Sequence, residues 1–133
     1  MLLASCSSGS DGKPDADPTK LSGTCGLPTP EPTRDESLVP DGFLPEGAEI
    51  SNAQAERGGF LTAINVRLSV AQALKFYKAA VKEAGYKIIN ADNEGFEAEI
   101  YLRKAKRLAA IQIRTSTCDD RSIVFINEIV PDA

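Results

Sequence analysis

Histidine and tryptophan are absent from the 133-residue sequence, and only three cysteines and one methionine occur. Without histidine, the chain cannot form a Ser-His-Asp triad, a Cys-His dyad, a histidine zinc site or a histidine pH switch. No run of about 18 apolar residues is present, so no segment has the pattern of a membrane-spanning helix. The charge is nearly balanced, with 15 Lys and Arg against 19 Asp and Glu, which does not indicate a nucleic-acid partner. The composition leads away from enzymes in general, and we expect neither a metal site nor a cofactor.

Proline is concentrated at the N-terminus, where six of the eight prolines fall within the first 40 residues. Small polar residues accompany them, and such a composition buries too little apolar area to offset the entropy of ordering the chain. We therefore expect residues 6–40 to form a disordered Pro/Ser/Gly-rich tether and residues 41–133 to form one globular domain. A domain of this size has a small core, so one covalent cross-link would matter to its stability.

Residues 70–84 have the pattern of an amphipathic helix. Ser69 and Gln72 form a Ser-x-x-Gln capping box, which satisfies free backbone amides at the helix start. Apolar residues at three- and four-residue spacing would form one face: Val70, Ala73, Leu74, Tyr77, Val81 and Ala84. Gly85 is expected to end the helix in a left-handed conformation, with Tyr86 folding back on it.

Five further segments have the composition or alternation of strands: residues 60–68, 86–90, 96–103, 107–115 and 123–130. The short links between them favour antiparallel pairing. The last segment is apolar on both faces except at Asn127 and Glu128, which indicates a central strand. The predicted fold is two-layer α+β, with one helix covering a mainly antiparallel sheet of about four to five strands.

The first residues contain a short targeting motif, Leu3-Ala4-Ser5-Cys6, followed directly by a serine- and glycine-rich stretch. The motif resembles the lipobox of bacterial lipoproteins, whose cysteine becomes acylated. A complete signal peptide has a basic region and about 7–15 apolar residues before the box, so residues 1–5 are interpreted as a remnant of one. The layout of residues 44–130 is similar to that of small bacterial lipoproteins of unassigned function. The resemblance implies a protein outside the cytoplasm, anchored in the cell membrane by acyl chains on Cys6.

Acylation of Cys6 would leave an even pair of cysteines in an oxidising compartment. Cys25 and Cys118 both lie among loop-forming residues, so a disulfide between them would interrupt no strand. It would close a loop of roughly 93 residues and contribute about 4–5 kcal/mol in the chain-entropy model. The alternative is two free thiols.

The densest acidic group comprises Asp92, Glu94, Glu97 and Glu99. It lacks the spacing of an EF-hand calcium loop. Glu97 and Glu99 would project from one strand face about 7 Å apart, a separation that overlaps that of inverting glycosidases. A carboxylate-based hydrolase is therefore one hypothesis, and a solvated strand face or weak cation binding are the others.

A cationic group is expected around a hairpin turn: Arg103, Lys104, Lys106 and Arg107, with Arg114 nearby. It could contact anionic headgroups or cell-wall phosphates, at about 1 kcal/mol per cation. The simpler interpretation is a soluble turn whose cations discourage edge pairing and partly neutralise Glu97 and Glu99 across strands. Tyr101 is the one aromatic residue on this face, which is too few for the stacking that single-stranded nucleic acid requires.

These patterns predict a lipid-anchored binding or accessory module at the cell envelope, without catalysis, that contacts an envelope protein or an anionic surface. The candidate surface residues are Glu97, Glu99, Tyr101, Arg103, Lys104, Lys106, Arg107 and Arg114. Two alternatives remain at this point: the Glu97/Glu99 hydrolase, and an inhibitor or immunity-type domain that binds a protein through the same face.

Overall fold

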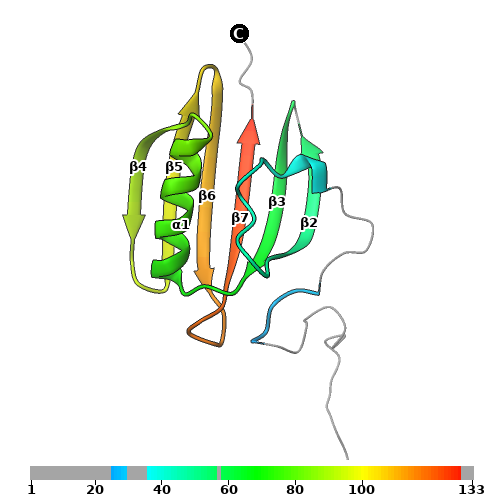
Figure 1. Ribbon diagram of the computed structural model, residues 1–133, viewed down its shortest axis with the longest axis vertical. Helices are drawn as coiled ribbons and strands as arrows, with labels where there is room; N and C mark the ends of the chain where they lie inside the picture. The colour runs from blue at the N-terminus through cyan, green and yellow to red at the C-terminus, as the bar shows by residue number, and fades with distance from the viewer. Residues whose placement is uncertain (1–24, 30–35, 57, 130–133) are drawn as a thin grey trace, which may run out of the picture.

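The computed structural model describes residues 25–29, 36–56 and 58–129. These residues form one antiparallel sheet in the order β2-β3-β7-β6-β5-β4, with one α-helix packed against it (Figure 1). The elements in chain order are η2 (Glu36–Leu38), β2 (Glu49–Glu56), β3 (Gly59–Val66), α1 (Val70–Glu83), β4 (Lys87–Asn93), β5 (Glu97–Lys104), β6 (Arg107–Thr115) and β7 (Ser122–Ile129). The α+β class is confirmed.

The sheet has six strands rather than the expected four to five. The strand that the sequence pattern did not indicate is β2, which is rich in alanine, asparagine and glutamate, residues depleted in strands. It forms because β3 supplies the pairing: Ile50 lies opposite Ile64, and Gln54 lies opposite Leu61. Strand β7 lies between β3 and β6, so the expected interior position of residues 123–130 is confirmed.

Both ends of α1 follow the predicted local chemistry. The Ser69 hydroxyl accepts a hydrogen bond from the Gln72 backbone amide, and the Gln72 side chain accepts one from the Ser69 amide. At the other end, Gly85 has a φ of 91°, its amide donates to the Lys82 carbonyl, and the Tyr86 amide donates to Val81. This is the Schellman arrangement, and it directs the chain back into β4.

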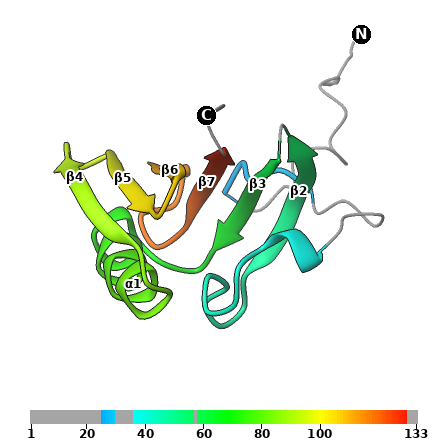
Figure 2. The ribbon, with the colours of Figure 1, turned by 90° about the horizontal axis from the view of Figure 1, so that it is seen from above.

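The apolar face of the sheet is covered by two elements, not by the helix alone as expected. Helix α1 packs against β4, β5 and β6, while the segment of residues 36–48 lies on the same side over β2 and β3 (Figure 2). Val39 and Phe43 bring this segment into the core. The largest fully buried side chains include Tyr77, Phe43, Ile64, Ile100, Leu102, Ile111, Ile113 and Ile126.

One hydrogen bond ties the two covering elements together. Tyr77 is fully buried on α1, and its hydroxyl donates to the backbone carbonyl of Phe43 at 2.9 Å. Burial raises the pKa of Tyr77, so the neutral phenol is the form that the fold stabilises. Its contribution is complete below the ordinary tyrosine pKa of about 10 and is lost as the pH rises above that value.

We expect Tyr77→Phe to lower the free energy of unfolding by about 1–2 kcal/mol, because the buried Phe43 carbonyl loses its donor while packing is conserved. Urea unfolding followed by circular dichroism measures the change. Tyr101→Phe is the matched control, since the Tyr101 hydroxyl is exposed and its loss should change stability by less than about 0.5 kcal/mol. Equal effects of the two substitutions would contradict the assignment.

Candidate functional site: the open face of the sheet

The sheet face opposite α1 carries most of the predicted surface residues, and we call it the open face. On β5, Ala98, Ile100 and Leu102 are buried against the helix, so the alternate residues Glu97, Glu99, Tyr101 and Arg103 project to the open face. The antiparallel register then places Glu97 opposite Arg114 and Glu99 opposite Gln112 of β6.

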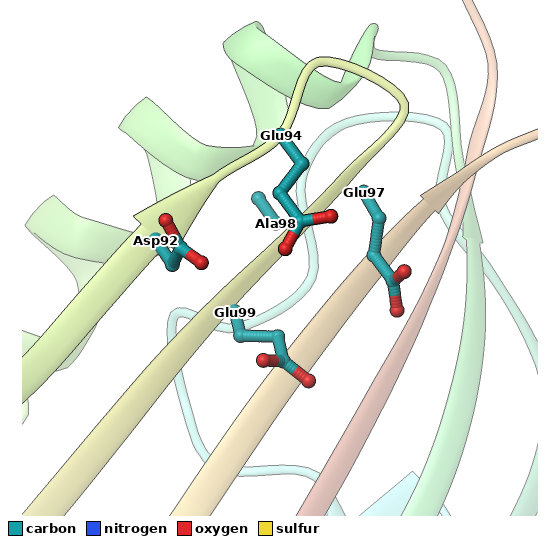
Figure 3. Close-up of a pocket in the computed structure, with 5 residues that line it drawn as sticks. All are labelled: Asp92, Glu94, Glu97, Ala98 and Glu99. Carbon is teal, nitrogen blue, oxygen red and sulfur yellow. The ribbon is translucent and has the colours of Figure 1, made fainter.

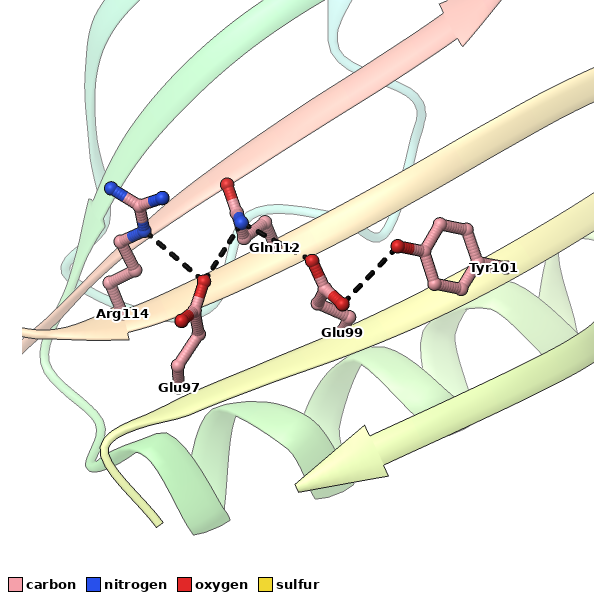
Figure 4. Close-up of polar contacts among 5 residues, drawn as sticks. All are labelled: Glu97, Glu99, Tyr101, Gln112 and Arg114. Atoms are coloured by element: carbon pink, nitrogen blue, oxygen red, sulfur yellow. Dashed lines mark hydrogen bonds and ion pairs between the residues drawn. The ribbon is translucent and has the colours of Figure 1, made fainter. Parts of the chain in front are cut away.

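These side chains form a continuous polar network (Figure 4). The Gln112 amide nitrogen donates to Glu97 at 2.8 Å and to Glu99 at 3.3 Å, and Arg114 pairs with Glu97 at 3.4 Å. The Tyr101 hydroxyl donates to Glu99 at 3.2 Å, and this hydrogen bond raises the pKa of Tyr101. Gln112 was not among the predicted site residues. Gln112 lies between the buried residues Ile111 and Ile113 in β6, and this alternation places it on the same sheet face as Arg114.

The acidic residues meet at the β4–β5 turn. Asp92, Glu94, Glu97 and Glu99, with Ala98, line a polar pocket of about 50 Å³ (Figure 3). Small-molecule ligand pockets commonly have volumes of about 300–1,000 Å³. The pocket beside Glu97 and Glu99 is smaller than this, so it does not support the glycosidase hypothesis. Among the described residues, no group of three or more Cys, Asp or Glu is placed to hold a metal ion.

The cationic residues of the β5–β6 hairpin do not form one cluster. Lys104 turns to the helix side, where its ammonium donates to the Ala84 carbonyl at 2.6 Å and lies 5.3 Å from the centre of the Tyr86 ring. Arg107 also turns to that side and pairs with Glu128 at 2.9 Å. Arg103 projects to the open face and Lys106 is exposed in the turn. Glu97 is therefore paired by Arg114 rather than by the hairpin cations, and Glu99 has no cationic partner among the described residues.

Glu128 is the one buried acid among the described residues, with 3% of its surface exposed. It accepts hydrogen bonds from Arg107 and from the Tyr86 hydroxyl. Burial and this bond raise the pKa of Tyr86. These two hydrogen bonds compensate the buried carboxylate. Because the donors come from other elements, Glu128 also joins the end of β7 to the start of β6 and to the chain after α1.

A segment near the β6–β7 loop and the end of β3 is fastened to the domain by a disulfide and a hydrogen bond. Cys25 and Cys118 are joined by a disulfide with their Cα atoms 5.2 Å apart, as predicted. The strap, which we define as residues 25–29, lies on the side of the sheet away from α1 (Figure 2). The Asn65 side chain donates to the Pro28 carbonyl at 2.6 Å, and Leu27 is 6% exposed. The predicted lipidation site, Cys6, lies outside the described residues.

A shallow groove runs along α1 beside the loop at Gly42. It encloses about 550 Å³ and is lined mainly by Phe76, Ala79 and Ala80, with Gln72, Lys75 and Glu83 at its rim. Phe76 is partly buried against the core and forms part of the groove wall. The sequence carried no signal for this groove, because its second wall comes from a distant loop.

Comparison with known proteins gives no match to a family model and no match among curated proteins. No helix in the described part of the chain has the length and apolar character needed to cross a membrane.

Proposed function

We propose that this chain is a bacterial lipoprotein, acylated at Cys6 and held on the extracytoplasmic face of the cell membrane. In this proposal its domain is a non-catalytic binding module that presents the open face to an envelope protein. The lipobox-like motif at residues 3–6 and the Pro/Ser/Gly-rich segment that follows it motivate the anchor.

The Cys25–Cys118 disulfide is the observation that carries the proposal. Disulfides persist in oxidising compartments and are rare in the cytosol. The bond also uses two of the three cysteines, so Cys6 is the one thiol left for acylation. In addition, the bond attaches the tether at Cys25 to the β6–β7 loop at Cys118, so a pull on the anchor would be borne by a covalent link rather than by the sheet.

The open face has the composition of a protein-binding surface. Tyr101, 40% exposed, lies on β5 between Glu99 and Arg103. Arg114, which lies opposite Glu97 on β6, is placed over Phe125, 5.9 Å from the ring centre. Tyrosine and arginine are the residue types enriched at the energetic centres of protein interfaces. The hydrogen bond from Tyr101 to Glu99 and the ion pair of Arg114 with Glu97 hold these side chains in place before a partner arrives, which lowers the entropy cost of binding.

Metabolic labelling with a palmitate analogue tests the anchor. The gene, expressed in a bacterial host with its native upstream region, should yield a labelled, membrane-associated product, and Cys6→Ala should abolish both the label and the association. The matched control is the double variant Cys25→Ser/Cys118→Ser, which should keep the label because these thiols are not acylated. A label that survives Cys6→Ala, or no label on the native product, would refute the proposal.

A further inference from the structure

Among the described residues, strand β4 forms one edge of the sheet and pairs only with β5. Its outer side carries Ile89, which is 54% exposed at a bulge between Ile88 and Asn90. An exposed edge is a place where another strand can pair unless the chain protects it. The distribution of charge along this edge indicates what kind of strand can pair with it.

The β4–β5 hairpin places like charges directly opposite each other at both of its ends. Lys87 lies opposite Arg103, and Asp92 lies opposite Glu99, all four on the open face. Like charges in directly opposed positions destabilise a sheet. The first pair makes one end of the β4 edge cationic, and the second makes the other end anionic.

Nothing within the described part of the chain compensates these pairs. Neither Lys87 nor Arg103 takes part in an ion pair there, since the two pairs found are Arg107–Glu128 and Arg114–Glu97. Asp92 accepts only the adjacent Asn93 amide. Glu99 accepts hydrogen bonds from Gln112 and Tyr101, both neutral. Uncompensated local conflicts of this kind are expected where a surface meets a partner.

We propose that the partner at this edge is a second copy of the same chain, placed with its β4 antiparallel to the first. A two-fold axis near Ile89 and Asn90 brings the cationic end of each copy against the anionic end of the other. Lys87 and Asp92 are about 17 Å apart along the strand at 3.4 Å per residue. Because the interface is isologous, the spacing is identical in both copies, so both charge contacts form together.

The other edge strand does not have this property. Strand β2 reads Glu-Ile-Ser-Asn-Ala-Gln-Ala-Glu and contains no cation, so it cannot complement itself. The bulge in β4 interrupts the regular ladder of free backbone groups, which prevents a long flat β-extension. The dimer is therefore held mainly by the charge contacts and by the two Ile89 side chains, and it is sensitive to salt.

Sedimentation velocity of the 133-residue chain tests the dimer. At about 100 μM protein we expect a dimer in about 20 mM NaCl and a monomer in about 500 mM NaCl, where charges are screened within about 4 Å. Lys87→Asp should raise the dissociation constant about tenfold, because it replaces an attraction by a repulsion at both symmetric contacts. Lys75→Asp, the same charge change on the exposed side of α1, should leave the constant unchanged.

A charge swap distinguishes this contact from a general effect of net charge. The quadruple variant Lys87→Asp/Arg103→Glu/Asp92→Lys/Glu99→Arg has the net charge of the native chain and exchanges the sign of both ends of the edge, so it should dimerise at low salt. Thermal unfolding of each variant verifies that it is folded. A native chain that is monomeric at low salt, a dimer unaffected by Lys87→Asp, or a folded charge-swap variant that stays monomeric would each overturn the proposal.

Discussion

Replacing Cys25 and Cys118 together by serine is expected to lower the free energy of unfolding by about 4–5 kcal/mol. The disulfide spans 93 residues, a loop that contains β2 to β6 and the helix, and β7 follows it. Without the disulfide, the unfolded chain regains the conformational entropy that loop closure had removed, and unfolding becomes more favourable. The strap then keeps only non-covalent contacts, chiefly buried Leu27 and the hydrogen bond from Asn65 to Pro28. Domains of this size have a total free energy of unfolding of about 5–15 kcal/mol, so the variant should be only marginally stable.

Urea unfolding of the native chain and the double serine variant at the same pH measures this difference. Native protein in excess reductant should unfold at the same urea concentration as the variant, because both lack the cross-link. Cys6→Ser is the control and should leave the midpoint unchanged, since Cys6 is not part of the disulfide. A loss below about 1 kcal/mol would mean that the unfolded chain is already compact or that the loop carries little entropy.

Gly59→Ala is expected to cost about 3 kcal/mol, through a steric conflict at the start of β3. A Cβ atom at this position would lie 1.7 Å from the Glu128 carbonyl oxygen and 2.9 Å from the Ile129 Cα. Both are backbone atoms, so no side-chain rotation relieves the overlap. Strand β3 would have to move away from β7, which weakens the pairing that begins at Phe60 opposite Glu128.

Gly42→Ala separates this effect from the general cost of replacing glycine. Gly42 has a φ of +85°, and a Cβ there would meet no atom within 4 Å. Its replacement should cost only about 1 kcal/mol, the price of a left-handed conformation for a residue with a side chain. If thermal or urea unfolding shows Gly59→Ala to be as mild as Gly42→Ala, the close approach of β3 and β7 is relaxed in solution.

The features that the sequence predicted correctly depend on neighbouring residues. The helix was indicated by its capping box at Ser69, its apolar spacing and its glycine terminator, all within 17 residues. The outward direction of Glu97, Glu99 and Tyr101 follows from the two-residue period of a strand. The disulfide was predicted from the cysteine count once Cys6 was taken as the anchor.

The features that were missed depend on pairing between distant segments. The sequence of β2 has little strand propensity, and β3 makes it a strand. Arg103 and Lys104 lie on opposite sides of the sheet because they are adjacent in β5, but only the packing of α1 brings Lys104 to the Ala84 carbonyl. Gln112 joins Glu97 and Glu99 because of the β5–β6 register.

The sequence by itself determined the helix, most strands, the cysteine pair and the side of the sheet on which each strand residue lies. It predicted an anchor at Cys6 from a motif that is independent of folding. Only the tertiary structure decided which charges oppose each other, including Lys87 with Arg103 and Asp92 with Glu99. The reason is physical: periodicity and capping act over a few residues, whereas register is set by the packing of both faces of the sheet at once.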